Sequence, residues 1–237
     1  MSDGFSRVAL LADTHGNLVA LEAVLAEVAE LGVRHIVVAG DIAWGVQPCE
    51  TVARVMALGP NVIVIRGNAD REVAHPETVA ADPDLGASTA WCAAQMTDEQ
   101  RRWLDELPLT ATLRIKGMGD VLVCHGSPRS DTEGMRPDTD PDLIASWLAG
   151  TPEPIVVCGH THVQFERTIG RHRIVNPGSV GLHYGVGGAQ WALLGSGGVE
   201  LRTTAYDSER AADLAAASGM PGADELAAFL RDPTRMS

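Results

Sequence analysis

Oxygen and nitrogen donors recur along the chain where short apolar runs end. The side chains of this kind are, in chain order, Asp13, His15, Asp41, Asn68, His125, His160 and His162. Carboxylate, amide and imidazole groups together suit manganese, iron, zinc or nickel better than a calcium cage or a thiolate site. The set is too large for one ion, whereas one shared carboxylate gives each of two ions four protein ligands and leaves positions for water and substrate oxygens. The sequence therefore predicts a two-metal site.

Each of these donors also has a simpler structural explanation when it is taken alone. Asp13 or Asn17 fits a helix cap, and Gly40-Asp41 fits a turn. The alternation of His160 and His162 places two rings on one face of a strand without any metal. Because all the motifs follow one another at the ends of apolar strands, a shared site is favoured over independent structural roles.

Three strand–loop–helix units are expected to position the first donors. Apolar runs at 8–12, 35–39 and 62–65 each end in a polar loop that contains glycine. After the first loop, apolar residues recur at helical spacing from Leu18 to Leu31, between an N-cap at Asn17 and Gly32. A second helix is expected from about Pro48 to Leu58. This alternation predicts a mostly parallel sheet with ligands at the carboxyl ends of its strands.

The rest of the chain departs from this rhythm. Residues 71–120 are interpreted as a helical insertion with an Ala/Trp-rich helix and a second helix opened by Thr97. A hairpin of 110–115 and 121–124 is expected to begin a second, mixed or antiparallel sheet. The tail at 208–237 carries two Ala-rich helical stretches, and residues 1–237 are expected to form one domain. Further strands are expected at 155–158, 165–169, 173–175, 190–194 and 199–204.

The ordered motifs resemble those of a known superfamily, the calcineurin-like metallophosphoesterases. They are Asp13-x-His15, Gly40-Asp41, Gly67-Asn68-x-Asp70, His125-Gly126 and Gly159-His160-x-His162. The stretch 176–180 (Asn-Pro-Gly-Ser-Val) resembles the segment that follows the last motif in the small bacterial and archaeal phosphodiesterases of this superfamily. The resemblance implies an α/β fold of the four-layer α/β/β/α type, with two facing mixed sheets and helices outside.

The resemblance also implies how the ligands divide between two divalent ions, with manganese expected first and iron, zinc or nickel as alternatives. One ion takes Asp13, His15, Asp41 and His162; the other takes Asp41, Asn68, His125 and His160. Asp41 is then the bridge, and Asp41, Asn68 and His125 are the expected catalytic residues. A metal-bridging hydroxide is the expected nucleophile.

Position 69 departs from the family pattern. Phosphoprotein phosphatases of this superfamily have a histidine there that acts with the following acidic residue as proton donor to the leaving group, whereas this chain has Ala69 before Asp70. Asp70 could orient water, pair with Arg66 or Arg71, or have a structural role. The candidate substrate-binding residues are Arg129, Arg136 and His183, each of which could instead be an ordinary loop residue.

The expected reaction is hydrolysis of a small phosphodiester. A phosphomonoesterase and a dinucleoside-polyphosphate hydrolase are the alternative enzymes. A non-catalytic scaffold, resembling the retromer subunit that uses this fold, is the alternative outside enzymes. Competent donors at every ligand position favour an enzyme over the scaffold.

Charge and composition limit the partners and the compartment. The chain has 18 Lys and Arg against 31 Asp and Glu, a net charge of −13, which disfavours bulk binding of nucleic acid. Its 4 cysteines lack CxxC spacing, and its apolar runs are shorter than the ~18 residues of a membrane span. We therefore expect a cytoplasmic protein without a membrane partner, and a homo-oligomer is left open.

Overall fold

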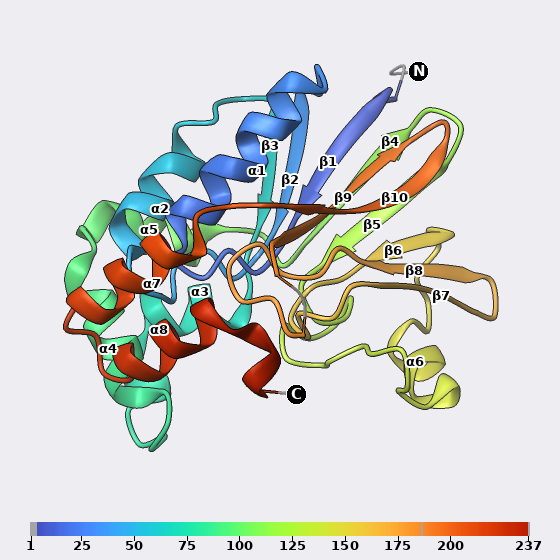
Figure 1. Cartoon of the computed structure of the whole chain (residues 1–237). Helices are drawn as coiled ribbons and strands as arrows, with labels where there is room; N and C mark the ends of the chain where they lie inside the picture. Colours follow the sequence, from blue (N-terminus) through green and yellow to red (C-terminus); the bar gives the residue numbers. More distant parts are fainter. Residues whose placement is uncertain (1–3, 186, 237) are drawn as a thin grey trace.

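Two five-stranded sheets lie face to face in the computed structural model, which describes residues 4–185 and 187–236 (Figure 1). The strands are β1 Arg7–Leu11, β2 His35–Ala39, β3 Val62–Ile65, β4 Thr110–Ile115, β5 Gly119–Cys124, β6 Ile155–Val157, β7 Phe165–Ile169, β8 His172–Asn176, β9 Ala189–Gly195 and β10 Gly198–Thr204. The helices are α1 Leu18–Glu30, α2 Pro48–Met56, α3 Asn68–Ala74, α4 Gly86–Gln95, α5 Asp98–Glu106, α6 Pro141–Trp147, α7 Ser208–Ala217 and α8 Ala223–Arg231, with short 3₁₀ turns at Pro76–Thr78 and Pro233–Met236.

The first sheet has the order β10-β9-β1-β2-β3. Its strands β1, β2 and β3 are parallel, as the alternating pattern predicted, and β9 pairs antiparallel with β1. The last two strands of the chain therefore belong to this sheet and make it mixed. One face packs against α1 and α2 through Leu21, Val24 and Val52, which explains why its parallel strands are continuous apolar runs.

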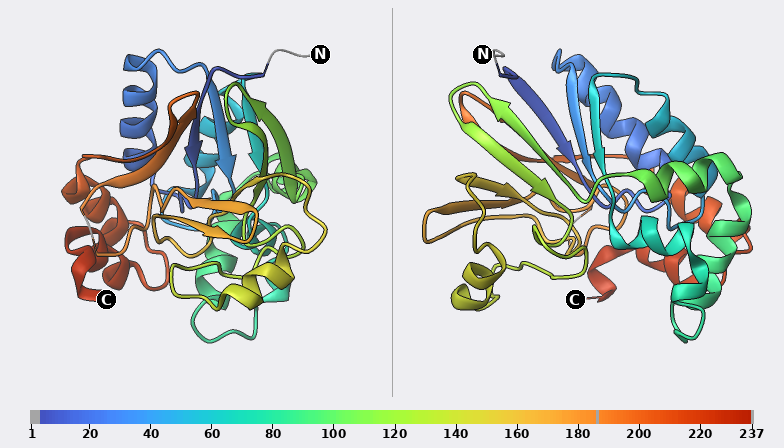
Figure 2. Two further views of the ribbon diagram at one scale, coloured as in Figure 1. Left: turned by 90° about the vertical axis from the view of Figure 1, so that its right-hand side faces the viewer. Right: turned by 180° about the vertical axis from the view of Figure 1, so that it is seen from behind.

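The second sheet has the order β4-β5-β6-β8-β7. Strands β5, β6 and β8 are parallel, while β4 and β7 pair antiparallel with β5 and β8. Apolar side chains of both sheets, including Val8, Leu10, Val121 and Val157, form the layer between them. The implied four-layer sandwich is confirmed (Figure 2). On the outer face of the second sheet, α6 is the one helix of the described chain that joins the buried cluster.

Helices α3, α4 and α5 lie between β3 and β4, within and just before the predicted 71–120 insertion. Thr97 caps α5: its hydroxyl accepts from the Gln100 N–H, and the Gln100 side chain accepts from the Thr97 N–H, both at 3.1 Å. The helical part ends at Glu106, and residues from Thr110 onward already form β4 and β5. Cys92 and Leu104 of this segment are fully buried in the same core as α1 and α2.

The tail forms two helices, as its Ala-rich stretches predicted. Buried side chains of α7 and α8, among them Ala212, Ala215 and Phe229, pack against each other. Leu182, which precedes a loop at the carboxyl end of the sandwich, is partly buried in the same cluster. No helix in the described ranges has both the length and the apolar character needed to cross a bilayer.

Candidate metal centre

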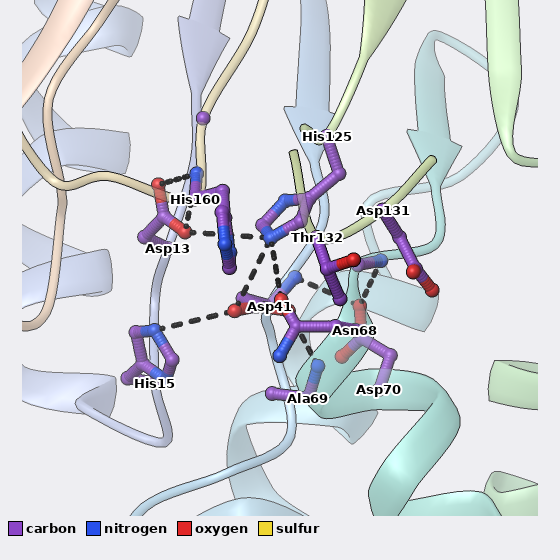
Figure 3. Close-up of polar contacts among 12 residues, drawn as sticks. Asp13, His15, Asp41, Asn68, Ala69, Asp70, His125, Asp131, Thr132 and His160 are labelled. Atoms are coloured by element: carbon purple, nitrogen blue, oxygen red, sulfur yellow. Dashed lines mark hydrogen bonds and ion pairs between the residues drawn. The ribbon is translucent and has the colours of Figure 1, made fainter. Parts of the chain in front are cut away.

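The loops that follow β1, β2, β3, β5 and β6 meet at one end of the sandwich, where the carboxyl ends of parallel strands point (Figure 3). Backbone hydrogen bonds join these loops directly. The Asp13 N–H donates to the Gly40 carbonyl at 3.0 Å, and the His15 N–H to the Asp41 carbonyl at 2.9 Å. Within the second sheet, the Gly159 N–H donates to the His125 carbonyl at 2.7 Å, and the Gly181 N–H, in the loop after β8, donates to the Asp13 carbonyl of the first sheet at 3.0 Å. The candidate ligands are therefore held on one continuous backbone framework.

Most candidate ligands have a left-handed backbone conformation. Within the described ranges, non-glycine residues with positive φ are found at five positions, with values from 47° to 65°, and all five are candidate ligands: Asp13, His15, Asp41, His160 and His162. Such conformations cost side-chain-bearing residues on the order of 1–3 kcal/mol each and cluster at functional sites. The backbone is thus strained where the donors converge and not elsewhere in the described chain.

Two glycines leave room for this convergence. Gly40 has φ of +88°, and a Cβ there would lie 2.8 Å from Nδ1 of His125. A Cβ at Gly67 would lie 2.1 Å from Oδ1 of Asp41. Real Cβ atoms do not approach other atoms so closely, so the Gly-Asp and Gly-Asn motifs require glycine because of the packing beside the donors.

The first group of donors consists of Asp13, His15, Asp41 and His162, whose ligand atoms all lie within 4.8 Å of one another. Nε2 of His15 is 3.0 Å from Nε2 of His162 and 3.6 Å from Oδ2 of Asp41. Nε2 of His162 is 3.5 Å from Oδ1 of Asp13. Residues separated by 147 positions in the chain thus direct their nitrogen atoms at one point.

The second group consists of Asp41, His125 and His160, again with ligand atoms within 4.8 Å of one another. Nε2 of His125 is 3.3 Å from Oδ2 of Asp41 and 3.2 Å from Oδ1 of Asn68, which adds the amide oxygen to this group. All seven donors expected from the sequence are therefore brought together, and Asp41 is common to both groups. With Asn68 included, the two groups have the same membership as the ligand sets that the motif resemblance implied.

The carboxylate of Asp41 is oriented by a backbone hydrogen bond. The Ala69 N–H donates to Oδ1 of Asp41 at 2.8 Å. The other oxygen, Oδ2, faces Nε2 of both His15 and His125. Position 69 therefore orients the shared carboxylate through its main chain, although its side chain is only a methyl group.

The tautomers of two histidines follow from their hydrogen bonds. Nδ1 of His125 is 2.8 Å from the Ala39 carbonyl, and Nδ1 of His162 is 2.8 Å from the Leu182 carbonyl. Because a carbonyl only accepts, each Nδ1 carries a proton, and each ring directs its Nε2 at the cluster. Nε2 atoms and carboxylate oxygens that converge at these distances can coordinate a cation that lies between them. The donor set therefore fits divalent metal ions.

Burial makes the uncompensated charges of the cluster costly. It raises the pKa of Asp13 well above its ordinary value and lowers the pKa of His15 to about 4. Burial would also lower the pKa of His125, but the carboxylates of Asp41 and Asp13 raise it to about 10. Burial would raise the pKa of Asp41, which His125 and His15 instead hold below its usual range. The Asp41 carboxylate also repels that of Asp13, and positive charge from metal ions would relieve this repulsion.

Asp70 has a structural role. It is fully buried, and its carboxylate accepts from the N–H groups of Asp41 at 2.8 Å, Ile42 at 2.7 Å, Ala43 at 3.1 Å and Gly67 at 3.0 Å. Burial and the nearby Asp41 raise the pKa of Asp70 to about 6. Asp70 thus joins the loops that carry Asp41 and Asn68.

Neither arginine considered as a partner of Asp70 forms an ion pair with it. Nη1 of Arg66 is 3.4 Å from Oδ1 of Asp105, and Nε of Arg71 is 2.8 Å from Oδ2 of Asp131. Both guanidinium groups therefore bind other carboxylates, and the oxygens of Asp70 remain with the backbone N–H groups.

The expected substrate-binding residues lie in three different places. Arg136 is exposed and lines a pocket of about 650 Å³ together with His160 and His162. Arg129 pairs with Glu133, with Nη2 2.6 Å from Oε1, and lines a different pocket beside α6. His183 is buried, and its Nε2 is 3.1 Å from the Tyr206 hydroxyl. Of the three, the structure brings only Arg136 to the mouth of the cluster.

Two aromatic residues beside the cluster were not identified from the sequence. The Tyr184 ring stacks on His162 with centroids 5.5 Å apart, and the Trp44 ring meets His15 edge-on at 5.7 Å. Tyr184 directly follows His183, which the sequence offered as a candidate substrate-binding residue. Trp44 follows the Gly40-Asp41 motif by a few residues, and proximity to that motif is the one signal that could have found it.

Comparisons with known proteins agree with this geometry. Residues 7–194 match the family model described as the calcineurin-like phosphoesterase superfamily domain. Protein MJ0912 of Methanocaldococcus jannaschii is 30% identical over 195 residues, 74% of this chain and 76% of that protein. A metallophosphoesterase from Sphaerobacter thermophilus is 25% identical with a TM-score of 0.76, covering 97% of this chain and 100% of that one. PH1004 of Pyrococcus horikoshii OT3 shares the fold, with 22% identity and a TM-score of 0.83 over 94% and 97% of the chains.

We predict that Asp70→Asn destabilises the protein even without metal. An amide group in place of one oxygen points a donor at backbone N–H groups that need an acceptor, and each unsatisfied buried group costs about 1–3 kcal/mol. The free energy of unfolding, measured by urea denaturation of metal-free protein, should fall by about 3 kcal/mol. Asp98→Asn, at a side chain that is 87% exposed, is the control and should change it little. An Asp70→Asn protein as stable as the parent would contradict this structural role.

Proposed function

The chain belongs to the calcineurin-like phosphoesterase superfamily, and we propose that it is a metal-dependent hydrolase of small phosphodiesters. The observation that carries the proposal is the convergence of all seven donors on two groups that share Asp41. A protein that used this fold only as a scaffold would have no need of every donor, nor of a strained backbone at five of them.

We further propose that two divalent ions bind per chain, with manganese as the first candidate. Asp13, His15, Asp41 and His162 would hold one ion, and Asp41, Asn68, His125 and His160 the other. When bound, such ions supply a deprotonated water at neutral pH and positive charge for the phosphoryl oxygens. Mixed oxygen and imidazole donors are compatible with manganese, iron, zinc or nickel.

The chain's own residues orient the reaction. Oδ2 of Asp41 faces both groups, so this carboxylate fixes their spacing. Both carboxylate oxygens of Asp13 accept from the His160 N–H at 3.1 Å, which holds the loop after β6 against the loop after β1. Arg136, which lines the same pocket as His160 and His162, would bind a non-bridging oxygen of the substrate. The buried Cys124 thiol, whose pKa burial raises, is unsuited as a nucleophile.

The preference for a diester rests on charge. Arg136 supplies the one guanidinium in the described lining of the pocket, which suits the single negative charge of a phosphodiester. The side chain of Ala69 cannot protonate a departing alkoxide from either kind of ester, so it predicts a need for good leaving groups. A phosphomonoesterase or a dinucleoside-polyphosphate hydrolase is the alternative that substrate measurements must distinguish.

We propose the cytoplasm as the site of action. All four cysteines are free, and Cys92, Cys124 and Cys158 are buried. Free cysteines are typical of a reducing compartment. Measurement of the thiol content of protein isolated from its source cells tests this proposal, because disulfide-bonded protein would contradict it.

Metal analysis tests the cofactor proposal. Protein reconstituted with manganese should hold about two ions per chain, and Asp41→Asn should lower the occupancy of both sites and reduce turnover by at least about 100-fold. Asp98→Asn, whose carboxylate is exposed and distant from the cluster in sequence, is the matched control. Unchanged occupancy and turnover in Asp41→Asn would exclude a shared carboxylate at this position.

A leaving-group series tests the absence of an imidazole at position 69. General acid catalysis contributes about 10²–10⁴-fold, so rates should fall steeply as the leaving group becomes more basic. Ala69→His, with metal content verified, should raise the rate selectively for alkyl leaving groups. Ala69→Gln is the control for added volume, because overpacking next to Asn68 can itself disturb the site. A flat dependence in the parent protein, with chemistry rate-limiting, would mean that another group donates the proton.

A further inference from the structure

An apolar groove of about 200 Å³ lies beside the metal centre, between the loop around Tyr184 and helix α8. Its walls are formed mainly by aromatic and aliphatic side chains: Trp44, Leu182, Tyr184, Leu226 and Phe229, with Glu225 as the one charged residue in the described lining. Contiguous apolar surface with a single charged side chain is typical of a small-molecule site.

The groove is continuous with the pocket above the metal centre through Tyr184, which lines both. One side of the Tyr184 ring stacks on His162 at 5.5 Å, with an interplanar angle of 24°. The same ring meets Phe229 edge-on at 5.4 Å, with an angle of 65°. The Tyr184 ring of the groove is therefore in direct contact with His162, a candidate metal ligand.

A second lining residue, Trp44, also contacts a candidate metal ligand. Trp44 contacts His15 edge-on at 5.7 Å, and its Nε1–H donates to the Ser88 hydroxyl at 3.2 Å, which fixes the indole ring. The Phe229 side chain is only 5% exposed and is held by the packing around it. The Tyr184 side chain is 40% exposed and accessible to a ligand. Preformed aromatic walls of this kind stack on flat rings at a low entropic cost.

We propose that this groove binds a flat aromatic group of the phosphate ester, such as a nucleobase or an aryl ring, while the phosphate lies at the metal centre. The inference rests on the proposed phosphodiesterase function and adds the substrate class to it. Leu226 and Phe229 belong to α8, Ala223–Arg231, which lies beyond the matched family domain at 7–194. Helix α8 thus completes a subsite whose other walls, Trp44, Leu182 and Tyr184, lie within the matched domain.

Two phosphonates separate the groove from the metal centre, because their P–C bonds withstand hydrolysis and both present the same phosphonate group. Binding of methylphosphonate to manganese-loaded protein, measured by calorimetry, reports the metal centre. The ratio of phenylphosphonate to methylphosphonate affinity reports the groove. Stacking of one ring on aromatic side chains predicts a preference of about tenfold for the phenyl compound. Thymidine 5′-phosphorothioate, compared with inorganic thiophosphate, distinguishes a nucleobase site from a general aryl site.

Tyr184→Ala should reduce the phenyl preference to near one, whereas Tyr184→Phe, which keeps the ring, should retain it. Leu201→Ala, at a leucine that is 39% exposed on β10, is the control and should leave both affinities unchanged. Metal content is measured for each variant, and Leu226→Ala provides a second test from α8 that does not depend on the ring beside His162.

The outcomes distinguish this inference from the function on which it rests. If methylphosphonate binds but the parent protein shows no phenyl preference, the groove is not a subsite and the proposed function stands. A preference that survives both Tyr184→Ala and Leu226→Ala likewise overturns the inference. If neither phosphonate binds to metal-loaded protein, both the phosphate site and the subsite are excluded.

Discussion

The need for positive charge among the buried donors around Asp41 is the constraint on which the site depends. Oδ2 of Asp41 and the Nε2 atoms of His15 and His125 approach within 3.3 to 3.6 Å in a buried region. The Nδ1–H of His125 is already donated to the Ala39 carbonyl, so its Nε2 faces the carboxylates. Such an arrangement is unfavourable without positive charge and becomes favourable around divalent ions. The geometry is therefore organised around cations.

The surrounding fold holds this arrangement against its own strain. Each donor lies just beyond the end of a strand, and the packed layer between the sheets fixes where its loop begins. Hydrogen bonds between loops maintain the left-handed backbone at five of the candidate ligands. The Asp70 carboxylate accepts from four backbone N–H groups that belong to the loops after β2 and β3. Metal binding would add its free energy to the folded state, because the ligands are assembled only there.

Most of the fold and the set of side chains that converges at the candidate metal centre were predicted from the sequence, because both leave local signals; their role as ligands stays a prediction. Apolar runs that stop at polar glycine-containing loops mark strands, and the predicted strands at 35–39, 62–65 and 110–115 agree with the structure residue for residue. Contacts between distant parts of the chain leave no such local signal. Tertiary packing decides that β9 pairs with β1 and that Arg129 forms an ion pair with Glu133. It also decides that Tyr184, and not His183, lies beside the cluster. The role of Asp70 was undecided for the same reason, since its partners come largely from a different loop.

Anomalous diffraction from crystals of manganese-loaded protein tests the central claim most directly. The account predicts two manganese peaks per chain at the carboxyl end of the sandwich, with Oδ2 of Asp41 between them. One peak is expected among Asp13, His15 and His162, and the other among Asn68, His125 and His160. A single peak, or two peaks that do not share Asp41, would contradict the shared-carboxylate arrangement from which the proposed chemistry follows.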